Sequence, residues 1–195
     1  MATIAAAISS SSRKRVTATG YKTTAQAHAN ARQLAIEAFE DVVHAQPTTN
    51  ELRMLLAVAL HESTFGAGWR GNGEGSNNMG ALQAGSGWTG ETFATKDTHP
   101  TSTGGSIAYE GQFRKYSSPL EGWQDLVRVL YIQSPATRIA AASGDPRAVA
   151  KAMRRAGYYE GQGPTQDARI GAYEQALVNA LWEIDHWGTA MKAST

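Results

Sequence analysis

An apolar helix that ends in a single carboxylate is predicted by the stretch LLAVALHESTFG, residues 55–66. Its leucines and alanines recur at helical spacing, and Glu62 lies seven residues after Leu55, so the carboxylate projects from nearly the same face. Burial among apolar side chains raises the pKa of a carboxyl group, and so does the negative end of the helix dipole. A carboxyl group that stays protonated near neutral pH is what a general acid needs. A solvated Glu62 at a simple helix end is the alternative interpretation.

The sequence on either side of this stretch marks where the helix begins and ends. Thr48 is followed three residues later by Glu51, which is a capping-box pattern. After the helix, residues 66–106 are rich in Gly, Asn, Thr and Ser and contain no convincing helix. Long loops inside a compact domain are usually functional or disordered, and embedded aromatic residues favour a functional loop. We therefore expect a structured, functional loop region directly beside Glu62.

Length and composition exclude several classes of protein. The 195 residues are enough for one domain with a sizeable core. Charged residues make up only 18% and the net charge is +1, so no nucleic-acid partner is indicated. There is no cysteine, and no apolar run approaches the roughly 20 residues of a membrane span. The five histidines lack metal-ligand spacing, so we expect no metal and no cofactor.

The first 22 residues differ from the rest of the chain. Residues 1–22 are rich in Ser, Thr and Ala with a short basic cluster, and we interpret them as a flexible arm before a single domain at residues 23–195. The apolar start, residues 1–8, lacks a basic segment before it, which is the wrong order for a secretory signal. We therefore expect delivery to the outside by lysis, a dedicated export machine or a virion, with a virion or appendage partner as one role for the arm.

Periodicity and capping signals predict a mainly α, α+β domain. A short β-hairpin is predicted for residues 107–116, turning at Glu110-Gly111. The predicted helices are 24–45, 50–65, one from 118 through 130, one from 145 to 156 and one from 165 to about 187. This pattern indicates a two-lobed fold, in which a helical bundle and a small β or loop lobe border a cleft suited to a polymer.

Five short motifs follow one another in the order of a known family. They are Glu62-Ser63, SNNMGALQA at 76–84, WTG at 88–90, FRKYSSP at 113–119 and AGY at 156–158. This order resembles glycoside hydrolase family 73, the bacterial cell-wall glucosaminidases, and most of all the domain of the flagellar rod-associated peptidoglycan hydrolases. The resemblance covers roughly residues 50–185. It implies a lysozyme-like fold and cleavage of β-1,4 bonds between N-acetylated amino sugars in peptidoglycan.

The same resemblance implies roles for individual residues. Glu62 would be the general acid, and a second carboxylate in the small lobe would activate water or stabilise the transition state. The nearest counterpart is Asp97, with Glu91 and Glu110 as competitors. Tyr158 would bind the N-acetyl group of the substrate or orient a carboxyl group. The residues implied to contact the sugar are Ser63, Asn78, Gln83, Trp88 and Tyr116.

Aromatic side chains in the loop region also suit a glycan, because a pyranose ring presents C–H groups to an aromatic face. Trp69, Trp88 and Phe93 are the candidates, and Trp88 belongs to a matched motif. Trp123 and Trp182 lie on predicted helix faces, and we expect them in the core.

One departure from the family pattern leaves the reaction open. Gly-Ala-Leu-Gln at 80–83 replaces the family's Gly-Ile-Lys type segment, and it is similar to the segment of lytic transglycosylases, which use one catalytic carboxyl group. A lytic transglycosylase is therefore the first alternative, and a non-catalytic glycan-binding or virion module is the second. The missing signal peptide suits a phage-encoded endolysin or a virion-associated lysin that acts at the bacterial cell wall.

Overall fold

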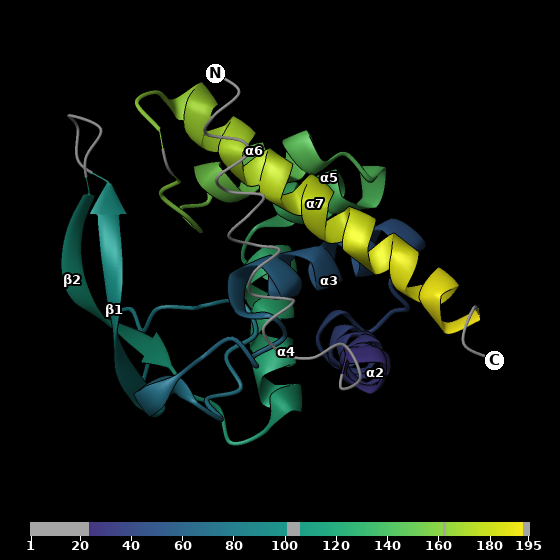
Figure 1. The fold of residues 1–195 in the computed structure, drawn as a ribbon, viewed down its shortest axis with the longest axis horizontal. Helices are drawn as coiled ribbons and strands as arrows, with labels where there is room; N and C mark the ends of the chain where they lie inside the picture. Colours follow the sequence, from purple (N-terminus) through teal and green to yellow (C-terminus); the bar gives the residue numbers. More distant parts are fainter. Residues whose placement is uncertain (1–23, 101–105, 162, 193–195) are drawn as a thin grey trace.

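The computed structural model describes residues 24–100, 106–161 and 163–192. The predicted arm, residues 1–22, lies outside them. The elements are α2 (Thr24–Val43), α3 (Thr49–Ser63), η1 (Gly71–Gly73), β1 (Thr92–Pro100), β2 (Ser106–Arg114), α4 (Pro119–Val127), η2 (Arg128–Ile132), α5 (Pro135–Ser143), α6 (Pro146–Arg155) and α7 (Gln166–Lys192). Figure 1 shows the helices gathered in one lobe, with the two-stranded sheet standing to one side. The predicted mainly α, two-lobed fold is confirmed.

Helix α3 runs through the centre of the helical lobe. Its residues from Leu52 to Leu60 are buried except Arg53, so the helix is covered on nearly all sides rather than on one face. The predicted capping box is present: the Glu51 amide donates to Thr48 Oγ1 at 3.2 Å, and the Thr48 amide donates to Glu51 Oε2 at 2.8 Å. Helix α7 lies across α3 (Figure 1) and brings Tyr173 and Leu177 into the same core. The C-terminal end of α3 is therefore held by the best-packed part of the molecule.

The small lobe is one antiparallel hairpin, and its predicted turn was wrong. Strands β1 and β2 pair in register from Thr92↔Arg114 to Pro100↔Ser106. Glu110-Gly111 therefore lies in the middle of β2, opposite Lys96 and Thr95. Gly111 is needed there for space and not for a turn, because a Cβ atom would lie 2.8 Å from the Phe113 ring. Strand β1 escaped prediction because it is mostly polar and has one large apolar residue, Phe93.

Aromatic packing joins this hairpin to the loop that precedes it. Phe93 and Phe113 are register partners with ring centroids 5.8 Å apart, and Trp69 packs its ring 4.9 Å and 5.2 Å from theirs. Phe93 is buried in this cluster, so its predicted stacking against a sugar was wrong. The cluster gives the small lobe a core of its own.

Three further details differ from the sequence prediction. Helix α5 was not predicted, and α7 continues to Lys192 through Gly188, beyond its predicted end. Trp123 is buried as expected, whereas Trp182 is 60% exposed on the outer face of α7, where it stacks on His186. Among the described helices, none combines the length and apolar character needed to cross a membrane.

Candidate active site

Glu62 occupies the last turn of α3, where the helical lobe faces the hairpin. The residue is partly buried, and its Oε1 atom accepts a hydrogen bond from the Tyr173 hydroxyl at 2.5 Å. Burial raises the pKa of the Glu62 carboxyl and is the largest influence on it; the charge of Asp97 also raises it, while His61 and the hydrogen bond from Tyr173 lower it. The predicted direction of the shift is confirmed. A carboxyl group in this setting retains its proton at a higher pH than an exposed glutamate does.

A left-handed turn directly after Glu62 fixes the helix end. Thr64, Phe65 and Gly66 have φ angles of 52°, 56° and 80°. Such angles are rare for non-glycine residues, and each costs on the order of 1–3 kcal/mol. The buried Ser63 hydroxyl supports the turn, because it accepts from the Gly66 amide at 2.8 Å and donates to the Met79 carbonyl at 2.7 Å. Ser63 therefore joins the helix to the loop; its side chain is enclosed, and its contact with sugar stays a prediction.

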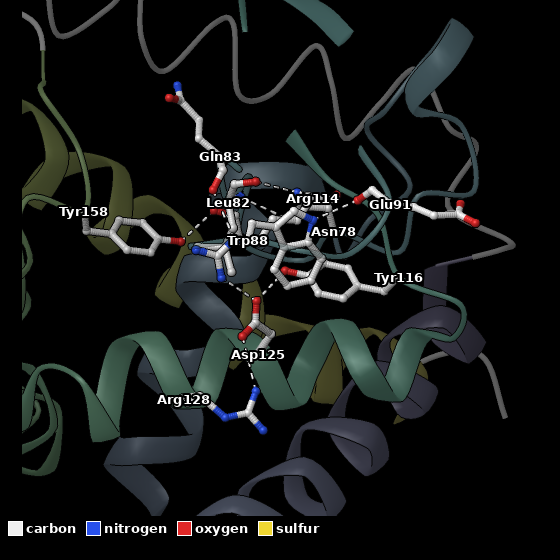
Figure 2. Close-up of polar contacts among 11 residues, drawn as sticks. Asn78, Leu82, Gln83, Trp88, Glu91, Arg114, Tyr116, Asp125, Arg128 and Tyr158 are labelled. Carbon is white, nitrogen blue, oxygen red and sulfur yellow. Dashed lines mark hydrogen bonds and ion pairs between the residues drawn. The ribbon is translucent and has the colours of Figure 1, made fainter. Parts of the chain in front are cut away.

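Tyrosine side chains surround the Glu62 carboxyl on the helical side. Tyr158 follows α6 and donates to the Gly80 carbonyl at 2.7 Å (Figure 2). Burial raises the Tyr158 pKa well above its usual value, and the negative charge of Glu62 raises it further. Gly80 has no room for a side chain, since a Cβ atom would lie 2.7 Å from the Tyr158 hydroxyl. Tyr158 thus lies near Glu62, and its own hydrogen bond holds the loop.

Asp97 faces Glu62 from β1. Its Oδ2 atom accepts from the Tyr109 hydroxyl at 2.8 Å and from Gln83 Nε2 at 3.1 Å, and Tyr109 is also its register partner on β2. Asp97 is the carboxylate whose charge raises the pKa of Glu62. Its competitors lie elsewhere: Glu91 is exposed and pairs with Lys115 at 3.0 Å, and Glu110 is exposed on β2. The structure therefore brings together Glu62, Asp97 and Gln83.

Asn78 is fully buried and shapes the loop. Its Nδ2 donates to the carbonyls of Leu82 and Arg114, each at 2.9 Å, and its Oδ1 accepts from the Leu82 amide at 2.8 Å (Figure 2). All of these partners are main-chain atoms, and the side chain has no exposed surface. Asn78 therefore ties the loop to the base of β2, and its contact with sugar stays a prediction.

Tyr116 also lies below the surface, in a charged cluster that the sequence did not reveal. The Tyr116 hydroxyl donates to Asp125 Oδ2 at 2.6 Å, and Arg114 Nη1 donates to the same atom at 2.7 Å (Figure 2). Arg128 Nη1 reaches Asp125 Oδ1 at 3.2 Å. Burial raises the pKa of Tyr116, and the adjacent Asp125 raises it further. The Tyr116 side chain is buried in this cluster, and its contact with sugar stays a prediction. An acidic residue within the apolar run of α4 was the one available signal for Asp125.

Gln83 and Trp88 are the predicted sugar contacts that keep accessible surface. Gln83 is exposed, and Trp88 is partly exposed with Nε1 donating to the Glu91 carbonyl at 3.0 Å. The Arg114 guanidinium lies 5.0 Å from the centre of the Trp88 ring, which fixes the ring beside the loop. Trp69 is partly buried, and its Nε1 donates to the Asn78 carbonyl at 2.9 Å.

A surface hollow of about 460 Å³ lies at the other end of α3. Its lining is Glu51, Tyr131, Ile132, Pro135, Arg138, Ile139 and Ala142. The Glu51 carboxylate is already occupied by the Thr48 amide and by Arg138 Nε at 2.8 Å, so it offers no free catalytic group. Within the described residues, no group of three or more His, Cys, Asp or Glu side chains could hold a metal ion.

Comparisons with known proteins agree with this geometry. Residues 41–186 match the glucosaminidase family model, described as mannosyl-glycoprotein endo-beta-N-acetylglucosaminidase. A peptidoglycan hydrolase mutant from Sphingomonas sp. A1 is similar in structure, with a TM-score of 0.59, 25% identity, and coverage of 82% of this chain and 97% of that chain. The C-terminally truncated glycoside hydrolase domain of Salmonella typhimurium FlgJ has a TM-score of 0.51 and 26% identity, covering 80% of this chain and 94% of that one.

A third structure shares the fold at lower identity. The catalytic domain of the autolysin Auto from Listeria monocytogenes has a TM-score of 0.51 and 14% identity, with 85% of this chain and 88% of that chain covered. A comparison with curated proteins gave no match.

Proposed function

Because the chain belongs to the glucosaminidase family and is therefore a glycoside hydrolase, we propose that it cleaves β-1,4 bonds in peptidoglycan, with Glu62 as the general acid. The observation that carries the assignment is the partly buried Glu62 carboxyl, whose pKa is raised at a helix end that faces a second carboxylate. The substrate class follows from the relatives, two of which are named as a peptidoglycan hydrolase and a glycoside hydrolase domain.

The acid step requires a carboxyl group that holds a proton until the bond breaks. Glu62 would donate this proton to the leaving sugar's oxygen as positive charge develops on the other sugar. Desolvation of the carboxyl supports this role, because it favours the protonated form and raises the pKa of Glu62.

Asp97 is the second carboxylate of the proposal. Tyr109 and Gln83 donate hydrogen bonds to one of its oxygens, which holds the side chain in place. An ionised Asp97 would activate a water molecule or stabilise the oxocarbenium-like transition state. We propose that Gln83 and Trp88 contact the sugars, because both have accessible surface beside the two carboxylates or the loop that carries them.

A lytic transglycosylase is the second candidate, and one observation favours it. Gln83 belongs to the Gly-Ala-Leu-Gln segment at 80–83, and its amide occupies the carboxylate that hydrolysis would need. A transglycosylase uses the 6-hydroxyl of the sugar itself and needs no activated water. Cleavage would then depend on Glu62 and not on Asp97.

The proposed site of action is the bacterial cell wall, where peptidoglycan is found. The single-domain interpretation of residues 23–195 belongs to this proposal, and the family match at 41–186 supports it. Delivery by a phage, and a virion or appendage partner for the arm, stay predictions because residues 1–22 lie outside the described structure.

Digestion of purified peptidoglycan tests the proposal. Wild type, Glu62→Gln, Asp97→Asn and the control Glu74→Gln would each be incubated with sacculi, and the soluble fragments read by mass spectrometry. Glu74 is exposed in the same loop region, so its change should leave release intact. Loss of release with Glu62→Gln supports the acid assignment, and equal release by wild type and Glu62→Gln refutes it. Sacculus binding without release by any form would indicate a glycan-binding module.

The fragment ends separate the two reactions. Reducing sugars, lost with Asp97→Asn, would indicate hydrolysis with two carboxylates. Anhydro ends that persist with Asp97→Asn would indicate a transglycosylase.

A further inference from the structure

Tyr173 is the described residue that hydrogen-bonds the Glu62 carboxyl. It lies on α7, 111 positions from Glu62 in the chain, and its side chain is 7% exposed. None of the five sequence motifs contains it, and its helical spacing explains only its place on the apolar face of α7. Helical spacing does not explain the hydroxyl group, because a phenylalanine would fill the same apolar position without binding a carboxylate.

Two neighbouring aromatic side chains hold the Tyr173 ring in place. Tyr159, in the segment after α6, stacks on it with ring centroids 3.9 Å apart and an angle of 9° between planes. His61 on α3 meets it edge-on, at 5.3 Å between centroids. Tyr159 is itself anchored by a 2.8 Å hydrogen bond from its hydroxyl to the Ala150 carbonyl. The Tyr173 hydroxyl is therefore a fixed donor rather than a mobile one.

A fixed donor on one carboxyl oxygen determines which oxygen carries the acid proton. A carboxylic acid has one O–H donor and keeps acceptor capacity on its other oxygen. The hydroxyl of Tyr173 donates to Oε1, and no described residue hydrogen-bonds Oε2. While the Tyr173 hydroxyl donates to Oε1, the proton of the acid would occupy Oε2, the oxygen that can face the substrate.

We propose that Tyr173 is a positioning residue of the catalytic acid: its hydroxyl binds Glu62 Oε1, fixes the orientation of the carboxyl and directs the transferable proton to Oε2. The inference rests on the proposed function, since it requires Glu62 to be the proton donor. It adds a residue from α7 to a site otherwise built from α3, the loop, the hairpin and the segment after α6.

The charged and titratable groups around Glu62 determine whether loss of the Tyr173 hydroxyl raises or lowers the pKa of Glu62. His61 lies beside it on α3, Asp97 faces it from β1, Tyr158 and Tyr159 come from the segment after α6, and Tyr173 comes from α7. Burial and Asp97 raise the pKa of Glu62, whereas the hydrogen bond from Tyr173 lowers it because it stabilises the charged form. Removing the hydroxyl should therefore raise this pKa.

The pH dependence of cleavage tests the proposal. The rate constant kcat/KM for soluble glycan chains of fixed length would be measured from about pH 4 to 9 for wild type, Tyr173→Phe and Tyr131→Phe. Tyr131 is the matched control, because it is a buried tyrosine that donates to the Glu51 carbonyl at the far end of α3. The alkaline limb reports loss of the Glu62 proton. With Tyr173→Phe it should move up by roughly one pH unit, the size expected for a lost hydrogen bond to a charged acceptor.

If Tyr173→Phe is inactive, a direct titration of Glu62 tests the proposal instead. The carboxyl carbon of Glu62 would be followed by NMR in ¹³C-glutamate-labelled protein, with Glu62→Gln identifying the resonance. An upward shift with Tyr173→Phe and none with Tyr131→Phe supports the role. An unchanged or lower value, or an equal shift in the control, overturns it. Undiminished cleavage by Glu62→Gln would instead refute the proposed function, whatever Tyr173→Phe does.

Discussion

Replacing Asp125 with alanine should destabilise the protein by about 3 kcal/mol, because it leaves buried donors without an acceptor. The carboxylate accepts from Tyr116, Arg114 and Arg128 at 2.6, 2.7 and 3.2 Å. The Arg128 side chain is 49% exposed, so water replaces its lost partner at little cost. The Tyr116 hydroxyl is buried and the Arg114 side chain is only 20% exposed, and each stranded donor costs about 1–3 kcal/mol.

Urea unfolding at pH 7, followed by far-ultraviolet circular dichroism, would measure this loss of free energy of unfolding. In a thermal scan the melting temperature should fall by about 6–12 °C, since 1 kcal/mol corresponds to about 2–4 °C in a domain of this size. Asp41→Ala is the matched control: its exposed carboxylate also accepts from a side chain of α4, Gln124 at 2.8 Å, and its loss should cost less than about 1 kcal/mol.

A double-mutant cycle with Tyr116→Phe completes the test. The two changes should be non-additive, because once Asp125 is absent the tyrosine hydroxyl has already lost its acceptor. A loss of less than about 1 kcal/mol for Asp125→Ala, or strictly additive effects in the double variant, would refute the reasoning.

Three other changes have expected outcomes. Glu62→Gln should stabilise the protein increasingly as pH rises above about 4.5. The pKa of Glu62 is raised in the folded protein, so wild type loses stability there when the unfolded chain ionises more readily. Denaturant unfolding at several pH values measures the gain, and a gain that does not change with pH would contradict this. Arg138→Met should lower the free energy of unfolding by about 2 kcal/mol at neutral pH and by less in acid. Arg138 helps hold the pKa of the buried Glu51 below its usual value, and the stability that this provides is lost as pH falls through the lowered pKa. A loss of stability that calorimetry finds independent of pH would count against this. Gly122→Ala should cost about 3 kcal/mol or more, since its Cβ would lie 1.9 Å from the Asn77 carbonyl oxygen, and an unchanged melting temperature would disprove that close contact.

Features that depend on residues close together in the sequence could be predicted from the sequence. The capping box at Thr48 and Glu51, the cap and proline that begin α4, and the acid at the end of α3 could all be read from neighbours in the sequence. Each depends on residues within about one helical turn, where spacing fixes the geometry.

Features that depend on tertiary contact could not be predicted in this way. Asn78 and Tyr116 match motifs of a glycan site, but packing turns both inward, and a motif does not record the direction of a side chain. Tyr173 reaches Glu62 only because α7 crosses α3. Gly111 has the residue type of a turn, yet it provides clearance for Phe113 within a strand.

The hairpin is anchored at its base, so a rotation at the base moves the residues farther along its strands. Its base is fastened to the preceding loop by the amides of Arg114, Lys115 and Tyr116, which donate to the carbonyls of Leu82, Glu91 and Ser76. Asp97 lies five residues along β1 from Thr92 at that base, which corresponds to an arm of about 17 Å at 3.4 Å per residue.

A small rotation at the base is therefore amplified at the carboxylate. A swing of about 10° would carry Asp97 through about 3 Å, while Glu62 stays fixed at its helix end. The angle of the hairpin therefore sets the spacing of the two carboxylates, and the hydrogen bond from Gln83 to Asp97 holds the strand against the loop at that point.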